Sequence, residues 1–472
     1  MKITTSRFKE NASGALGDSN LQAAMRRATG SFLSRRSAAV ADQGDFEALR
    51  AYCGAVKAHT LEYLDHYLEQ LVDRVEALGG TVHFAADGEE AVRIVADLAV
   101  ANGVRTVAKS KSMLSEEIHL NEALEAAGVC PVETDLGEYI LQIDGDFPSH
   151  IIGPALHKTK EQITQLFHEK IGTAADATVS ELTAAARRVL RRSFLEADMG
   201  VTGVNFAVAE TGTIALVENE GNIRFSTSLP RIHLAMMGIE KIIPRMRDLP
   251  AFLNVLTRSA TGQKASSYIS ILTGSRRTGE PDGPEAFHLL IVDNGRSSVL
   301  ADPKLRDILR CIRCGACLNS CPVYQQVGGH AYGWVYSGPI GAVLDPGLLG
   351  LEETRMLPHA SSLCGACGEV CPVKIPLPEL LVEHRRRAVE RGLAPRTERL
   401  GIGAYAFIAS RPILWNSGTT GGRVAARLLD RGGSLKAGWV PGLAGWLKER
   451  DFPAPARRSF RELWRRGLKD RK

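Results

Sequence analysis

The feature that most constrains this chain is a cluster of cysteines: seven of its nine lie between residues 311 and 371. The first four follow a C-x2-C-x2-C-x3-C-P pattern, made by Cys311, Cys314, Cys317, Cys321 and Pro322. Bacterial ferredoxins hold [4Fe–4S] clusters with this spacing, and the fourth cysteine serves the other cluster of the pair. Zinc sites favour two separated pairs of ligands instead. The pattern therefore predicts iron–sulfur chemistry.

A second, incomplete copy of the pattern follows. It has Cys364, Cys367, Cys371 and Pro372, with Ser361 where the first cysteine would stand. If ligands cross over as in two-cluster ferredoxins, the first cluster takes Cys311, Cys314, Cys317 and Cys371. The second cluster then takes Cys321, Cys364 and Cys367 and lacks one thiolate. Two clusters are predicted, most simply both [4Fe–4S].

Several answers are open for the fourth position of the second cluster. Ser361 is a weak alkoxide ligand, and Cys53 or Cys130 are more distant thiols. A partner residue or solvent is a third answer, and a [3Fe–4S] cluster is the fourth. Because an isolated buried cysteine most often acts as a small hydrophobe, we favour a [4Fe–4S] cluster with a weak or external ligand.

Other cofactor motifs are absent from the sequence. There is no G-x-G-x-x-G, no G-x-x-x-x-G-K-[ST] and no nucleophile elbow, and His168-Glu169 lacks the second histidine of H-E-x-x-H. We therefore expect electron transfer rather than hydride abstraction. The N-terminus does not resemble a secretory signal and no apolar run is long enough to span a membrane, which predicts a cytoplasmic chain with reduced thiols.

The region before the cysteines alternates between short apolar stretches and helical patterns. Strands are expected at 81–85, 106–108, 129–133, 204–209, 213–217, 268–272 and 288–292, and helices at 46–78, 89–101, 116–127 and 232–243. A Thr178–Glu181 capping box opens another helix. This rhythm favours an α/β domain with a parallel sheet flanked by helices over residues 46–300. We expect a loosely ordered polar arm over 1–45, a mainly helical cysteine module over 301–390 and a tail over 391–472.

The tail is strongly basic: residues 422–472 hold 14 Lys and Arg against 5 Asp and Glu. It and its approach also contain Trp415, Trp439, Trp446 and Trp464. A basic helical segment of this kind suits the acidic face of a partner protein, which we favour, or an anionic membrane surface. Nucleic acid is not expected, because the positive charge is confined to the tail and no nucleic-acid-binding motif accompanies it.

The chain resembles the lactate utilization protein B family. The resemblance rests on both cysteine motifs, the stretch 328–343 between them, and the segments 108–113 and 210–219. It implies an isomerase/CoA-transferase-like α/β domain, a ferredoxin-like module with two [4Fe–4S] clusters, and partner proteins A and C. It further implies the iron–sulfur subunit of a complex that oxidises L-lactate to pyruvate, with an unidentified electron acceptor. The alternative is that this chain itself binds and oxidises lactate or a related 2-hydroxy acid, using its incompletely ligated cluster.

Two further sets of residues are candidates for function. Lys109 and Lys111 follow a predicted strand and precede a helix, so they and the nearby Glu210 and Thr213 could bind a carboxylate or phosphate. A solvated turn explains the same residues. His330, Tyr332, Trp334 and Tyr336 lie between the cysteine motifs, where core packing is favoured over a contact with a cluster or substrate.

Overall fold

The structure is a computed structural model that describes residues 3–431, 434–435, 447, 450, 452–456, 458–465 and 467. It divides into two compact units, Met1–Arg391 and Gly392–Lys472, and each is described by itself. The strands of the first unit are β1 Thr81–Ala85, β2 Thr106–Lys109, β3 Cys130–Glu133, β4 Met199–Gly203, β5 Phe206–Val208, β6 Thr213–Glu218, β7 Ile232–Gly238, β8 Ile242–Ile243, β9 Tyr268–Leu272 and β10 Ala286–Val292.

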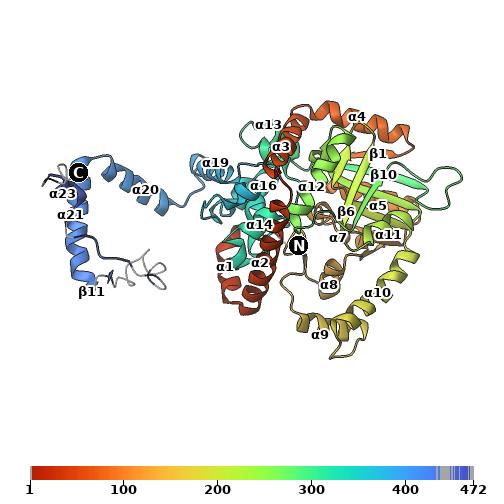
Figure 1. The fold of residues 1–472 in the computed structure, drawn as a ribbon, viewed down its shortest axis with the longest axis horizontal. Helices are drawn as coiled ribbons and strands as arrows, with labels where there is room; N and C mark the ends of the chain where they lie inside the picture. Colours follow the sequence, from red (N-terminus) through yellow and green to blue (C-terminus); the bar gives the residue numbers. More distant parts are fainter. Residues whose placement is uncertain are drawn as a thin grey trace. The chain divides into compact units, whose positions relative to one another are not determined.

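The helices of the first unit flank this sheet region and build the cysteine module (Figure 1). Before the module they are α1 Phe8–Gly17, α2 Ser19–Ala41, α3 Phe46–Glu62, α4 Leu64–Ala77, α5 Gly88–Ala101, α6 Met113–Glu117, α7 Leu120–Ala126, α8 Leu136–Asp144, α9 Lys160–Ile171, α10 Val179–Glu196, α11 Asn222–Ser228, α12 Leu249–Ala260 and α13 Arg296–Ala301. In the module they are α14 Ala316–Ser320, α15 Tyr324–Val327, α16 Gly338–Leu348, α17 Leu351–Thr354, α18 Ala366–Val370 and α19 Leu377–Glu390.

Six strands form one sheet in the order β1-β10-β7-β4-β2-β3, and every neighbouring pair is parallel. Helices α5, α6 and α7 pack on one face, where Val95 and Leu124 meet β-strand residues such as Leu234. Helix α4 and a second, four-stranded sheet of order β8-β5-β6-β9 cover the other face. The predicted α/β domain with a parallel sheet flanked by helices is therefore confirmed, and the second sheet is an addition to it.

The prediction of a helix over residues 232–243 is wrong. Residues Ile232–Gly238 instead form β7, which pairs in parallel with β10 and β4 and is buried along its whole length. A central strand covered on both faces carries a continuous apolar run, which periodicity alone cannot distinguish from a buried helix. The helix predicted from the capping box at Thr178 is confirmed as α10, where the side chains of Thr178 and Glu181 both make the expected backbone contacts.

The prediction that residues 1–45 form a loosely ordered arm is also wrong. The side chain of Asp18 caps α2 by accepting N–H groups of the first turn. Helices α1 and α2 pack on the cysteine module, contacting α14, α15 and the short helix η5 His330–Tyr332. Phe8 lies edge-on against Tyr332, with 5.3 Å between ring centroids. Few apolar residues suffice here because the arm covers part of the module's core rather than forming a core of its own.

The second unit contains α20 Arg396–Ala409, α21 Pro412–Leu429, α23 Phe460–Arg465 and the short strands β11 Asp430–Arg431 and β12 Ser434–Leu435. Arg423 pairs with Glu462 at 2.9 Å, and Tyr405 contacts Trp415 edge-on. The predicted tail is thus mainly helical where it is described, with the β11–β12 pair as an addition, whereas Trp439 and Trp446 lie outside the described residues. Across the described chain, no helix is both long and apolar enough to cross a membrane.

Candidate iron–sulfur module and adjoining cavity

The first cysteine loop is a tight turn that leads into α14. Arg313 and Gly315 both have left-handed backbone conformations, with φ of 60° and 74°. For a non-glycine residue such a conformation costs on the order of 1–3 kcal/mol. In return the chain wraps back on itself, so that the Arg313 N–H donates to Cys311 Sγ at 3.4 Å. The loop therefore directs both backbone N–H and thiol groups inward.

The second loop repeats this backbone with a different first residue. Leu363 and Gly365 have φ of 56° and 88°, matching Arg313 and Gly315, and α18 follows as α14 does. The Leu363 N–H donates to Ser361 Oγ at 3.1 Å. Ser361 thus holds the position that Cys311 holds in the first loop, with an oxygen in place of the sulfur.

The structure sorts the seven cysteines into two groups. Burial, followed by the charges of Cys314, Cys311, Cys371 and lastly Cys367, raises the pKa of the Cys317 thiol well above its usual value. Burial, followed by the charge of Cys321, raises the pKa of Cys367 to about 11. Helices α14 and α18 pack against each other, which brings the last cysteine of each motif beside the other loop. Cys371 thus interacts with Cys311, and Cys321 with Cys364, which is the proximity that crossing ligands would need.

Among these seven cysteines Cys364 alone is exposed; Cys311 is half-buried, and Cys321 and Cys367 are buried like the rest of the first group. Cys314, Cys317 and Cys371 are buried, together with an apolar cavity lined by Ile340 and Val373. In the second group Cys364 is exposed. A hydrogen bond from the Ala366 backbone lowers the pKa of its thiol.

A buried tyrosine tests whether these residues fit an iron–sulfur cofactor. The Tyr332 side chain has no solvent exposure, and its hydroxyl has no hydrogen-bond partner. Burial, and then the charges of Cys321, Tyr324, Cys317 and Cys367, raises its pKa. A buried donor without an acceptor is costly. Sulfur atoms of a cluster held by these thiols would supply the acceptor, so the donor set fits.

The other two cysteines lie in other elements. Cys53 is wholly buried within α3, and burial raises its pKa to about 12. Cys130 is exposed at the start of β3, an edge strand of the six-stranded sheet. Each therefore has a place in the α/β domain that does not involve the second cysteine group.

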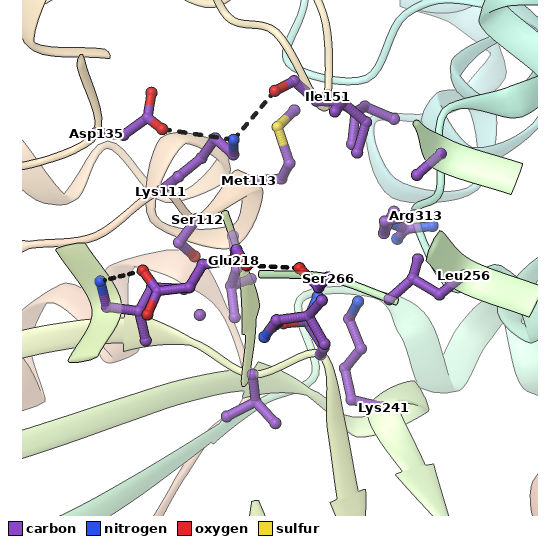
Figure 2. Close-up of a pocket in the computed structure, with 18 of the residues that line it drawn as sticks. Lys111, Ser112, Met113, Asp135, Ile151, Glu218, Lys241, Leu256, Ser266 and Arg313 are labelled. Atoms are coloured by element: carbon purple, nitrogen blue, oxygen red, sulfur yellow. Dashed lines mark hydrogen bonds and ion pairs between the residues drawn. The ribbon is translucent and has the colours of Figure 1, made fainter. Parts of the chain in front are cut away.

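A large cavity opens between the carboxyl edge of the sheet and the cysteine module (Figure 2). Its empty space measures about 1180 Å³ out to open solvent. Lys111 lines one side, where its ammonium group contacts the Ile152 carbonyl at 3.1 Å and Asp135 at 3.7 Å. Lys241 lines the opposite side, and Arg313 of the first cysteine loop closes the end beside the module.

A buried network of charges supports this end of the cavity. Arg296 pairs with Glu117 at 2.7 Å and with Glu240 at 2.8 Å. Glu240 also accepts from Arg313 at 3.2 Å. Although burial opposes ionisation, these two guanidinium groups hold the pKa of Glu240 at about 2. Tyr336 donates to Glu117 at 2.5 Å, with the Arg313 guanidinium 4.6 Å from its ring centre.

The predicted anion-binding residues are not brought together. Lys109 is fully buried, with its ammonium group 2.7 Å from Glu133 and 2.9 Å from Glu116. Of the four candidates, all within the described chain, Lys111 alone lines the cavity. Glu210 accepts the Met246 N–H at 2.9 Å, and Thr213 is buried at the start of β6. Sequence reasoning missed Lys241 and Arg313; the location of Arg313 inside the cysteine motif was the available signal.

The residues between the cysteine motifs mostly pack in the core. Trp334 and Tyr336 are buried and lie edge-on, 5.6 Å apart between ring centroids. The Nε2–H of His330 donates to the Phe147 carbonyl at 2.9 Å. His330 also lies near Asp146 and His157, a set whose ligand-type atoms lie within 4.8 Å of one another. However, His157 contacts Asp146 at 2.9 Å, and the Lys158 ammonium group is 2.7 Å from the same carboxylate. Protein partners already satisfy this set.

Comparison with known proteins matches three family models to the chain. The LUD domain matches residues 68–292, the 4Fe-4S dicluster domain residues 307–375, and the C-terminal domain of lactate utilisation protein B residues 383–469. The middle match makes iron–sulfur clusters the cofactor class of the cysteine module. A solved structure, a DUF162 family protein from Deinococcus radiodurans, is 15% identical with a TM-score of 0.26 over 48% of this chain and 98% of its own, an overlap that supports no argument about the fold.

Full-length relatives give the stronger result. Lactate utilization protein B of Bacillus licheniformis is 49% identical over 98% of this chain and 97% of its own length. The protein of the same name from Bacillus subtilis is 47% identical over 98% of this chain and 96% of its own. Identity at this level along nearly the whole of both chains, with matches to all three family models, shows that this chain belongs to the lactate utilization protein B family.

Proposed function

We propose that this chain is an electron-transfer protein with two [4Fe–4S] clusters, which acts in the oxidation of L-lactate to pyruvate. The observation that carries the proposal is the packing of α14 against α18, which gathers seven thiols into two adjacent groups. The names of the relatives supply lactate as the substrate of the system. Clusters of this type accept and release single electrons when bound.

In this proposal each group of side chains has a defined task. Cys311, Cys314, Cys317 and Cys371 hold the first cluster and exclude water from it. Cys321, Cys364 and Cys367 hold the second cluster, with Ser361 at its fourth position. Because Cys364 is exposed, the second group is the side from which an electron carrier can approach.

The wider assignments are part of the same proposal. We expect lactate utilization proteins A and C as partners, and the basic second unit as a surface for docking a partner or for peripheral membrane contact. All nine cysteines are free thiols, which suits a reducing, cytoplasmic compartment. We also expect the α/β domain to share its fold with the sugar-phosphate isomerases and CoA transferases.

The cavity beside the first cysteine group favours a second candidate function. Arg313 and Ile151 line both this cavity and the apolar cavity of Cys311, Cys314, Cys317 and Cys371. An acid bound there would lie next to the first electron carrier. In this version the chain itself binds and oxidises the 2-hydroxy acid.

The test uses the full chain purified without oxygen. Iron and sulfide analysis should give two clusters per chain, and dithionite should bleach the visible absorption. If the chain only transfers electrons, L-lactate bleaches the absorption when the partner proteins are added and does nothing alone. Bleaching by L-lactate alone favours the second candidate. A chain that loads clusters but is not reduced by lactate with the partners present would contradict the proposed function.

A further inference from the structure

We propose that the cavity between the α/β domain and the cysteine module binds the carboxylate of a 2-hydroxy or 2-oxo acid through Lys241 and Arg313. The inference rests on the proposed function for the class of acid. The carboxylate contact itself is argued from the structure alone.

Lys241 is the first of the two side chains that would bind the carboxylate. It ends the short helix η2 Ile239–Lys241, which leaves β7 at the carboxyl edge of the sheet, where open α/β sheets bind ligands. Figure 2 shows its side chain extending into the cavity, near Ser266 and Leu256. No described residue forms a hydrogen bond or ion pair with its ammonium group, in contrast to Lys111 across the cavity, which has two oxygen contacts.

Arg313 supplies a second, independent donor. Its side chain is 8% exposed, and its Nη1 atom is buried without any partner. The rest of the guanidinium group is fixed, because Nη2 donates to Glu240 at 3.2 Å and the group stacks over Tyr336. A fixed guanidinium with one free N–H edge is well suited to a carboxylate oxygen.

The charges around these two donors leave a positive surplus. Glu117 and Glu240 face Arg296, Arg313 and Lys241. Asp345 also faces Arg313, but burial raises the pKa of its carboxyl well above its usual value and favours the neutral form. Lys57 contacts the backbone carbonyls of Glu240 and Ile242, and burial lowers its pKa to about 7. Buried like charges are unfavourable unless an anion offsets them. A bound carboxylate would do so at the place where two of the cations have unused donors.

Arg313 also connects the proposed carboxylate site with the first cysteine group. Since Arg313 and Ile151 line both cavities, a carboxylate on Arg313 lies one residue away from the thiols of that group. A negative charge at that place opposes the addition of an electron nearby. Binding should therefore shift the midpoint potential of the first cluster to more negative values, even for an acid that is not oxidised.

The two donors assign only one end of the acid. Lys241 and Arg313 recognise the carboxylate, and because the cavity opens to solvent, its lining sets no limit on the side-chain end. We therefore expect longer 2-hydroxy acids to bind as well as L-lactate.

The experiment measures binding of pyruvate and L-lactate to the full chain with its clusters loaded, by equilibrium dialysis, together with a potentiometric titration followed by electron paramagnetic resonance. The test variant is Lys241→Met, which keeps the length of the side chain and removes its charge. Loss of a charged hydrogen bond should weaken pyruvate binding about tenfold or more. Lys241→Arg should restore most of it. The matched control is Lys304→Met, which removes a 59% exposed lysine of the same unit that does not line the cavity.

Three results would overturn the inference: no binding of either acid to the loaded chain, equal binding by Lys241→Met and the parent, or binding without any shift in the first cluster's potential. Equal affinity for acetate would overturn the class of acid. Each of these is separate from the proposed function, because cluster content and lactate-driven reduction with the partners present are measured on the same samples. Failure of those two readouts, with pyruvate still bound, would instead remove the electron-transfer role.

Discussion

The two cysteine loops share one backbone but differ in what surrounds them. Both have a left-handed residue before the second motif position and another after it. The first loop is enclosed by core side chains and borders the cavity of Lys241, whereas the second exposes Cys364 and begins with Ser361. The shared backbone conformation therefore determines the positions of the ligand residues in both loops. Solvent exposure and the first ligand atom, sulfur or oxygen, differ between the loops and distinguish what each site can do.

The largest expected effect comes from breaking the crossing of ligands. Cys371→Ser changes the second motif, yet under the proposed ligand set it should remove the first cluster, because Cys371 lies near Cys311 and Cys317. Iron content should fall by about half, and the resonance of the first cluster should be lost. Cys364→Ser is the matched control and should affect the second cluster only. Loss of the second cluster in both variants would mean that each motif binds its own cluster.

The next effect comes from making the loops alike. Ser361→Cys gives the second loop the same first residue as the first loop, so the second cluster should become a stable four-thiolate [4Fe–4S] cluster that survives exposure to air. Ser361→Ala removes the oxygen and should convert the second cluster to the [3Fe–4S] form, which is detected by electron paramagnetic resonance of the oxidised protein. If Ser361→Ala retains four irons at that site, the fourth ligand lies elsewhere.

A pH titration sharpens the difference, because Lys241 lies beside the first loop only. Burial, followed by the charge of Arg313, lowers the pKa of Lys241 to about 8. The group is protonated below that pH and loses its charge above it, so carboxylate affinity should be highest below pH 8 and decline as pH rises through it. A bound anion stabilises the charged form and moves the decline to higher pH. Equilibrium dialysis from pH 7 to 9 measures the change, and Lys241→Met should abolish it.

The smallest effect concerns Tyr332, which lies near cysteines of both groups. Tyr332→Phe keeps the edge contact with Phe8 and removes the hydroxyl. Loss of one hydrogen bond, worth about 1 kcal/mol, should lower a cluster potential by on the order of 50 mV. In the metal-free chain the same change removes a buried donor without a partner, so thermal stability should stay equal or rise. A lower melting temperature of metal-free Tyr332→Phe would indicate a protein partner instead.

Sequence reasoning predicted what is encoded locally. The spacing of the cysteines determines two short loops, and the side chain of Thr178 caps its own helix. It failed where burial overrides periodicity, as at Ile232–Gly238, and where a polar segment gains its structure from a distant core, as in α1 and α2. The cavity could not be predicted, because Lys241 and Arg313 meet only after the module docks on the sheet. Lys109 was misleading for the related reason that Glu133 comes from the next strand.

The packing of α1 and α2 on the cysteine module has a consequence for how the protein is made. The ribosome produces Phe8 and Met25 first, but the residues that cover them, such as Tyr332, emerge only after the whole α/β domain. Cys371 comes later still, so the first group of four thiols is incomplete until then. During most of synthesis the N-terminal helices therefore expose apolar side chains, and delivery of iron to the first site must be one of the last events in biogenesis. Cells short of iron should accordingly accumulate a chain with a folded α/β domain and a cysteine module without its clusters.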